Sequence, residues 1–589
     1  MAEKLKLHPK FSKDWTWLLN EAKTNIQEEK LVKWYGFRAP YGLLTRRLLF
    51  ALTGYAYIVS SAEHAELEQL VARLLPQTEP GSQIHYCLLF LNHTTACLKM
   101  VDSISTFILN KPENYVQEYT SHWYKIDYEY RKAIFTYRVL IDPTALPEHF
   151  PLEGKLEELN NTYRKYLDES NREWLRCLNE KEFKFRDIPV SKQYDFYDKE
   201  IAPQEQKIAV LISDALRYEV AVELMQSLNQ DSKNTVKCRN VLASLPSITK
   251  VGMANLLPCK SMRYSNDSVL VDGEPSSSSI YREAILKKKK ADARAISFRD
   301  VDSQVQSENR ELFKSSLVYI YHNHIDAIGD ERKTERQVFK AVEDTVAELK
   351  KVINRILSSY NVYKVLVVSD HGFIYNDFQI EEKDKESFTQ EDVITYHSRF
   401  QILSKPEKVD LAYTFPMEST SKFESGLFAV IPKSVNRYKL QGSGNQYVHG
   451  GGSLQELIIP ILECTRQRED VTFLVDAKLL GKDLKLMSNL LKFNLIQESP
   501  VSASEKERKM SVGIYYGSDL VSEEKEVVMN KTSDNPTERI FSIDLHLISG
   551  SAQASVYKLK IYDSENDKDK LNPLIEADIR NQSIIAPDF

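Results

Sequence analysis

The chain has 589 residues, of which 42% are hydrophobic and 28% charged, and its formal net charge is −6. This is the balance of an ordinary globular protein with about three or four domains. The mildly acidic charge gives no reason to expect a nucleic-acid binder, although it allows a local basic patch.

Cysteine usage and the hydropathy pattern exclude several other classes. The six cysteines are scattered and form no CxxC pair, which argues against a zinc ribbon or a disulfide framework and fits a reducing compartment. The N-terminal stretch MAEKLKLHPKFSKDW lacks the apolar core of a signal peptide, and no run approaches the ~18 apolar residues of a membrane helix. We therefore expect a cytoplasmic protein that does not associate with a membrane.

Residues 1–195 are expected to form a helical domain. Segments 62–75 and 156–178 place apolar residues three and four positions apart between charged ones, as amphipathic helices do. All five tryptophans of the chain lie in this region, and large aromatic side chains mostly fill protein interiors. No catalytic motif is visible in these residues.

Residues 196–468 are expected to form an α/β domain. Three continuous apolar runs of strand length occur here, at 208–213 (IAVLIS), 316–321 (SLVYIY) and 365–369 (VLVVS). Helical patterns lie beside them, at 219–228 and at 337–357. Buried strands that alternate with helices indicate a mostly parallel sheet covered on both faces.

Residues 469–589 are expected to form a β-sandwich. Four segments alternate apolar with polar residues, at 471–475, 510–516, 540–547 and 554–562. Polar turns separate some of them, which is typical of antiparallel strands.

Acidic residues follow the predicted strands of the α/β domain, at the edge of the sheet where ligands bind. Asp214 follows the first strand, Asp326 and Asp330 follow the second, and Asp370 with His371 closes the third. A single aspartate in such a place is a helix N-cap about as often as it is a ligand. Acidic groups that converge without a partner repel each other, however, so a divalent ion would be a natural partner for the set.

A hydroxyl and a further histidine complete this pattern. Thr249 lies in LPSITKVGM, where the loop leads into a predicted helix, and His449 precedes three glycines that let the backbone pass close to a ligand. Taken singly, these are also explained by a helix cap and a flexible loop. Together with the acids, they supply the mixed oxygen and nitrogen ligands that two divalent ions use in phosphoryl transfer.

Five motifs in order, SDALRYE, LPSITKVGMANLLP, HIDAIGD, VVSDHGF and HGGGSLQE, resemble the PglZ domain over about residues 205–465. This domain is a branch of the alkaline phosphatase superfamily, and the resemblance is strongest to the PglZ proteins of BREX phage-defence systems. It implies an alkaline-phosphatase-like, mostly parallel sheet flanked by helices. Those proteins generally carry more sequence before the helical region, so we expect this chain to lack it, and Met1 need not be the native start.

The resemblance also implies a role for each matched position. One ion would be held by Asp214, Thr249, Asp370 and His371, and a second by Asp326, Asp330 and His449. Thr249 would in addition be the nucleophile. Zinc is the usual ion of the family. Manganese is the alternative at the second position, because Asp330 stands where the wider superfamily commonly has histidine. Two carboxylates with one imidazole also suit manganese. Lys250 and Arg399 are candidate counter-charges for a substrate phosphate, with a surface position as the alternative.

The function expected from this resemblance is that of a metal-dependent phosphodiesterase or nuclease in phage defence. The implied partners are a methyltransferase, ATPases and a small adaptor of such systems, and nucleic acid stays open as a ligand because no base-reading motif is present. Two alternatives remain. One is a scaffold in which the metal supports folding, and the other is a phosphomonoesterase or phosphomutase for a small metabolite.

Overall fold

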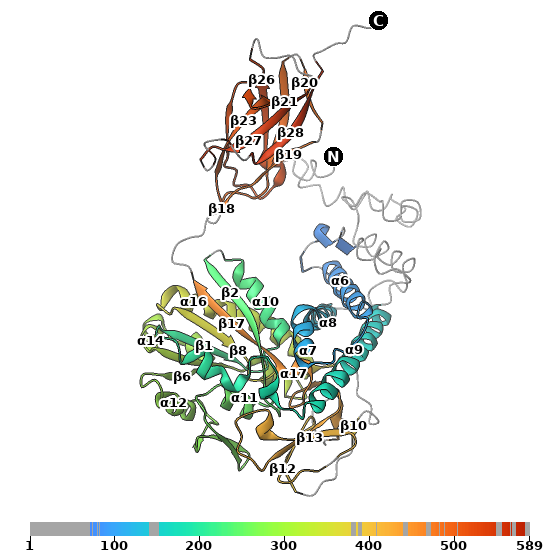
Figure 1. The fold of residues 1–589 in the computed structure, drawn as a ribbon, viewed down its shortest axis with the longest axis vertical. Helices are drawn as coiled ribbons and strands as arrows, with labels where there is room; N and C mark the ends of the chain where they lie inside the picture. Colours follow the sequence, from blue (N-terminus) through green and yellow to red (C-terminus); the bar gives the residue numbers. More distant parts are fainter. Residues whose placement is uncertain are drawn as a thin grey trace, which may run out of the picture. The chain divides into compact units, whose positions relative to one another are not determined.

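The computed structural model describes residues 71–582, with internal gaps. The gaps are 73–74, 79, 82, 141–151, 232, 378–384, 387–391, 408, 440–445, 467–472, 482, 488, 503–504, 549–555, 566, 568–569 and 571–572. Most of the helix predicted at 62–75 lies outside the described residues. The chain divides into two compact units, one up to Leu228 together with Val236–Arg466, and one from Gln467 onward together with Asn229–Thr235 (Figure 1).

The first unit is built on a six-stranded sheet with the order β2-β17-β8-β1-β7-β6. Its strands are β1 (Ile208–Ser213), β2 (Asn234–Leu242), β6 (Arg294–Ser297), β7 (Leu317–His322), β8 (Lys364–Val368) and β17 (Ile458–Arg466). Strand β1 runs parallel to β7 and β8, β6 runs parallel to β7, and β17 runs antiparallel to β8. The three apolar runs thus form the centre of a mostly parallel sheet, which confirms the predicted fold class.

Helices flank this sheet (Figure 1). They are α10 (Tyr218–Asn229), α11 (Thr249–Asn255), α12 (Ser279–Lys287), α13 (Phe298–Ser303), α14 (Gln306–Leu312), α15 (His324–Gly329), α16 (Val338–Ser359) and α17 (Leu454–Leu457). Helix α16 packs against β8 and β17, whereas α13 packs against β6 and β7. The helices predicted at 219–228 and 337–357 are therefore confirmed as α10 and α16.

Short strands extend the same unit in smaller sheets. An antiparallel sheet contains β11 (Val393–Tyr396), β12 (Gln401–Leu403), β14 (Phe428–Pro432) and β13 (Ala412–Pro416). A second contains β3 (Met262–Ser265), β4 (Ser268–Val271) and β5 (Glu274–Pro275). Two strand pairs join β9 (Ile374–Tyr375) to β16 (Tyr447–Val448), and β10 (Lys385–Glu386) to β15 (Arg437–Tyr438).

The helical segment that precedes the sheet shares its hydrophobic core. It comprises α6 (Gln83–Asp102), α7 (Pro112–Glu118), α8 (Tyr124–Val139) and α9 (Leu152–Glu180), and α6 packs against both α8 and α9. Buried ion pairs also cross this junction: Arg131 of α8 is fully buried and donates to Glu219 of α10 at 3.0 Å. The division of the chain into three domains at 195 and 468 remains a prediction.

The second unit is built mainly of strands, as predicted for the C-terminal residues, with one 3-10 turn at Pro536–Arg539. They are β18 (Phe473–Leu474), β19 (Ala477–Leu480), β20 (Leu484–Met487), β21 (Leu490–Gln497), β22 (Glu505–Lys506), β23 (Arg508–Tyr516), β24 (Asp519–Leu520), β25 (Lys525–Met529), β26 (Ile540–His546), β27 (Val556–Asp563) and β28 (Ile575–Asn581). Nine of them form one mostly antiparallel sheet around a core of their own. Within the described part of the chain, no helix has both the length and the apolar character needed to cross a membrane.

Candidate active site

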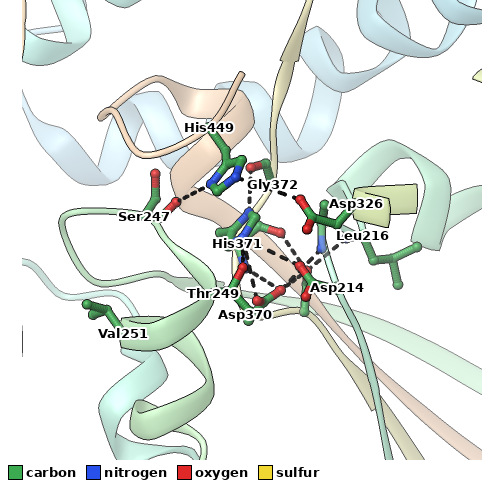
Figure 2. A network of polar contacts seen from close by, with 12 residues as sticks. Asp214, Leu216, Ser247, Thr249, Val251, Asp326, Asp370, His371, Gly372 and His449 are labelled. Atoms are coloured by element: carbon green, nitrogen blue, oxygen red, sulfur yellow. Dashed lines mark hydrogen bonds and ion pairs between the residues drawn. The ribbon is translucent and has the colours of Figure 1, made fainter. Parts of the chain in front are cut away.

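Six of the seven predicted ligands come together beside the carboxyl ends of β1 and β8, and Figure 2 shows them from close by apart from Asp330. Asp214 follows β1, and Asp370 with His371 follows β8. Thr249 is the first residue of α11, and His449 follows β16. Asp326 lies in the short helix α15, which follows β7 and ends before Asp330. Parallel strands place their carboxyl ends at one edge of a sheet, which explains this convergence.

The first group of ligands surrounds one nitrogen of His371. Its Nε2 lies 3.1 Å from Thr249 Oγ1, 3.5 Å from Asp214 Oδ1 and 3.5 Å from Asp370 Oδ2. A hydroxyl, an imidazole nitrogen and two carboxylate oxygens therefore face one another in a small buried space (Figure 2).

Two of these oxygens are buried without a hydrogen bond. Asp214 Oδ1 and Asp370 Oδ2 accept none from any described residue, although the other oxygen of Asp370 accepts from the backbone N–H of His371 at 3.0 Å. Leaving a buried acceptor unsatisfied costs about 1–3 kcal/mol, and more when it is charged. Burial, together with the neighbouring carboxylates of Asp370 and Asp326, raises the pKa of Asp214 well above its usual range. A bound cation would remove both penalties, so these residues fit a metal ion.

Backbone carbonyls fix the orientation of both histidines. His371 Nδ1 lies 3.0 Å from the carbonyl of Gly372, and His449 Nδ1 lies 3.3 Å from that of Ser247. A carbonyl can only accept, so each Nδ1 carries the proton and each Nε2 presents a lone pair. His449 Nε2 faces Asp326 Oδ1 at 3.7 Å, which is again a pairing of two acceptors that a cation would satisfy.

The two imidazole rings are stacked, with centroids 4.2 Å apart and planes inclined by 7°. This spacing is close to the ~3.5–4 Å between the ions of two-metal sites. The pair therefore suits two ions held side by side, with His371 serving one and His449 the other.

The second group contains a residue that the sequence motifs did not indicate. The hydroxyl of Tyr447 donates to Asp326 Oδ1 at 2.9 Å and thereby orients that carboxylate. Asp330 lies nearby at the end of α15; burial raises its pKa, Asp326 adds to the shift, and His449 opposes it. The only sequence signal for Tyr447 was its place two residues before His449.

Close packing accounts for a glycine in one of the motifs. A side chain on Gly252 would place its Cβ 2.3 Å from the carbonyl oxygen of Asp370, which is far inside van der Waals contact. Helix α11 can therefore approach the end of β8 only because this position has no Cβ. That approach sets the distance between Thr249 and His371.

The two predicted phosphate-binding side chains have other partners. Arg399 is fully buried and donates to both carboxylate oxygens of Glu456, from Nη2 to Oε2 at 2.7 Å and from Nε to Oε1 at 3.3 Å. Its other donors are accepted by the backbone carbonyls of Ser434 and Asn436. This position corrects the substrate-binding role expected for Arg399, since its donors are already taken. Lys250 is exposed and forms an ion pair with Asp267. His397 also lies beside the site, with the centroid of its ring 5.9 Å from that of His449. Burial lowers the pKa of His397 to about 4, and the neighbouring His449 adds to this shift.

Residues 196–464 match the family model described as the BREX system PglZ alkaline phosphatase-like domain. The chain contains a PglZ domain. The resemblance expected from the motifs is thereby confirmed, and the strand-end residues described above all lie within the matched segment.

Similar proteins extend this relationship beyond the PglZ domain. The alkaline phosphatase-like protein PglZ of Bacillus cereus (strain H3081.97) is 30% identical over 448 residues, covering 73% of this chain and 51% of that protein. The alkaline phosphatase-like protein BrxZ of Escherichia coli O9:H4 (strain HS) is 31% identical over 454 residues, covering 74% and 52%. The chain thus spans about half the length of the curated relatives it matches.

Solved structures also match part of the chain. The match to murine ectonucleotide pyrophosphatase/phosphodiesterase 5 covers 44% of this chain and 88% of the murine chain, with 12% identity and a TM-score of 0.33. The human protein of the same name covers 44% and 87%, with 10% identity and a TM-score of 0.32.

Proposed function

We propose that this PglZ-domain protein is a metal-dependent phosphodiesterase of a BREX-type phage-defence system, with Thr249 as its nucleophile. The observation that carries the proposal is the pair of buried, unsatisfied oxygens of Asp214 and Asp370, which face His371 Nε2. Thr249 Oγ1 lies 3.1 Å from the same nitrogen. A protein that needed these residues only for its fold would have no reason to bury carboxylates without partners.

Seven side chains would hold two ions in this proposal: Asp214, Thr249, Asp370 and His371 around the first, and Asp326, Asp330 and His449 around the second. When bound, two divalent ions supply a clamp for the attacking and leaving oxygens and lower the pKa of a hydroxyl. Zinc suits the imidazole in each group, and the two carboxylates and one imidazole of the second group would also accept manganese.

The residues of the chain then act in a simple order. Thr249 Oγ1 loses its proton to solvent and attacks phosphorus in line, forming a Thr–O–P bond as the bond to the leaving oxygen breaks, and the departing alkoxide takes up a proton from solvent to leave as the alcohol. Water then hydrolyses the Thr249 ester and restores the hydroxyl. His371 Nε2, which lies 3.1 Å from Thr249 Oγ1, holds the hydroxyl in place, because the carbonyl of Gly372 fixes the orientation of the His371 ring.

A diester suits this site better than a monoester. A monoester dianion carries more negative charge, and the two candidate counter-charges are engaged elsewhere, Arg399 with Glu456 and Lys250 with Asp267. The four carboxylates of the site already offset the four positive charges of two divalent ions, so a diester with a single negative charge leaves less unbalanced charge than a monoester dianion. This argument favours a phosphodiesterase, and a nuclease within that class, over the phosphomonoesterase alternative.

A scaffold role is the second candidate, and one observation favours it. The strand-rich unit has its own core, and its described residues include no cluster of His, Cys, Asp or Glu that could hold a metal. Such a unit offers a surface for partners. We propose that these partners are a methyltransferase, an ATPase and a small adaptor of the defence system, and that nucleic acid is a further ligand. We place this assembly in the cytoplasm, because all six cysteines are free thiols.

Hydrolysis of chromogenic esters tests the proposal. Protein stripped by a chelator is incubated with bis(p-nitrophenyl) phosphate or p-nitrophenyl phosphate, with and without zinc or manganese. The same assay is run on Thr249→Ala and Asp370→Ala, with Lys250→Ala as a surface control beside the nucleophile. We expect the wild type and the Lys250→Ala control to cleave the diester when metal is added, and the Thr249→Ala and Asp370→Ala variants to lose this activity.

The other outcomes select the alternatives. Faster cleavage of the monoester would identify a phosphomonoesterase. Folded protein that binds metal but cleaves neither ester, and a Thr249→Ala variant that still supports defence against phage in cells, would identify a scaffold.

A further inference from the structure

A second cluster of possible metal ligands lies outside the seven residues of the active site. It consists of His322, the last residue of β7, His324, the first residue of α15, and Glu348, within α16. Glu348 Oε2 lies 3.0 Å from His322 Nε2 and 3.2 Å from His324 Nδ1. The three atoms all lie within 4.8 Å of one another.

We propose that these three side chains bind a third divalent cation, of the borderline class to which zinc belongs. Two imidazole nitrogens and one carboxylate oxygen are a ligand set that zinc uses with an open fourth position. Ligands at about 2.0–2.1 Å from a tetrahedral ion lie about 3.3 Å apart, so the distances of 3.0 and 3.2 Å need little change to accept one.

The surroundings of the cluster favour an ion that exchanges with solvent. The side chain of His322 is 3% exposed, that of His324 31% and that of Glu348 41%, so the cluster leads from the interior to the surface. A pocket of about 630 Å³ opens beside it, and its walls include Phe298, Asp302 and all three proposed ligands. Water or a substrate oxygen can therefore reach the fourth position.

The ring of His322 is already oriented for this role. Its Nδ1 lies 3.1 Å from Ser213 Oγ, and Phe298 packs edge-on against the ring with centroids 4.6 Å apart. When the ring donates from Nδ1 to the serine hydroxyl, Nε2 is left with its lone pair towards Glu348. The alternative is a cluster without an ion, in which both imidazoles donate to one carboxylate oxygen, and the test below distinguishes the two.

An ion at this position would stabilise the segment behind the active site. The backbone N–H of Asp214 donates to the carbonyl of His322 at 2.7 Å, and His324 begins the helix that carries Asp326. Joining β7 and α15 to α16 through one ion would fix this turn without contact with substrate. The inference does not rest on the proposed hydrolase activity.

Cobalt(II) is a suitable probe, because its visible absorption reports imidazole and carboxylate ligation. The full chain is stripped of metal, loaded with cobalt, and analysed for bound metal and absorption. The variants are Glu348→Gln and His324→Ala, and the control is Asp344→Asn. Asp344 is a carboxylate on the same helix, 44% exposed, and paired with Lys340.

We expect each variant to bind one cobalt fewer per chain than the wild type, or to bind it at least tenfold more weakly, and the control to match the wild type. Thermal unfolding verifies that each variant is folded. The cobalt content is then measured in the double variant Asp326→Ala, Asp370→Ala, which removes the active-site ions and should still bind one cobalt per chain. Adding Glu348→Gln or His324→Ala to this background should remove that remaining cobalt. Equal cobalt content in wild type, Glu348→Gln and His324→Ala, or no cobalt bound in that background, would overturn the proposal. Because this background has no working active site, the result is independent of hydrolysis.

Discussion

Replacing Gly252 with alanine tests whether helix packing sets the position of the proposed nucleophile. The added Cβ would lie 2.3 Å from the carbonyl oxygen of Asp370 and 2.8 Å from its Cβ. Ordinary contact begins near ~3.5 Å, so α11 and the segment after β8 must separate by about 1 Å. The obstacle is backbone, which cannot turn aside as a flexible side chain would.

The consequence should be larger for function than for stability. Overpacking of this kind costs about 1–3 kcal/mol of unfolding free energy. A shift of about 1 Å would take Thr249 Oγ1 from 3.1 Å to beyond hydrogen-bond distance of His371 Nε2. Misplacement on that scale can cost about 100-fold in rate, so we expect a fall of this order in metal-dependent diester hydrolysis.

The assay combines thermal unfolding, zinc affinity and diester hydrolysis. Met253→Leu is the matched control, because Met253 is the next residue of the same helix, is buried, and tolerates a swap of similar volume. It should keep both the rate and the zinc affinity. If Gly252→Ala matches the wild type in stability, zinc affinity and rate, the packing argument is wrong.

Three other substitutions follow from the structure. Arg399→Ala should lower the unfolding free energy by about 3–5 kcal/mol, because it leaves the buried Glu456 unpaired, and a change confined to the KM would contradict this. Tyr447→Phe should weaken metal binding about 10- to 100-fold in a titration, since Asp326 loses its orienting hydrogen bond, and unchanged affinity would count against that role. In metal-free protein, the contribution of His397 to stability should fall by about 2–3 kcal/mol between pH 6.5 and pH 4, because the unfolded state protonates His397 near pH 6.5 and the folded state only near pH 4; denaturant titrations of the wild type and of His397→Gln isolate this contribution. His397→Gln should lose that part of the pH dependence, and a slope identical to the wild type would contradict the assignment.

The strand-end residues were predictable because each follows a local signal. An apolar run of strand length that ends in polar residues places Asp214, Asp370 and His371 at the ligand-binding edge of a parallel sheet. The structure finds all three there, in contact with one another. Their role as metal ligands is a prediction that the metal titrations address.

The partners of these residues were not predictable, because packing sets them across long sequence distances. Tyr447 reaches Asp326 from 121 residues away, and Glu456 meets Arg399 from 57 residues away. No helical or strand periodicity links such positions. From the sequence, Arg399 is a candidate counter-charge for a phosphate or a surface residue, and only the fold shows the carboxylate that allows its full burial.

The covalent state of Thr249 during turnover tests the central claim most directly. Zinc-loaded protein is mixed with a phosphodiester, quenched in acid within the first turnover, digested, and analysed by mass spectrometry. The account predicts that the peptide containing Thr249 gains the phosphoryl group with its remaining ester, and that Thr249→Ala gains no such mass on any residue. Turnover without an adduct on Thr249, or a Thr249→Ala variant that hydrolyses the diester at the wild-type rate, would contradict it.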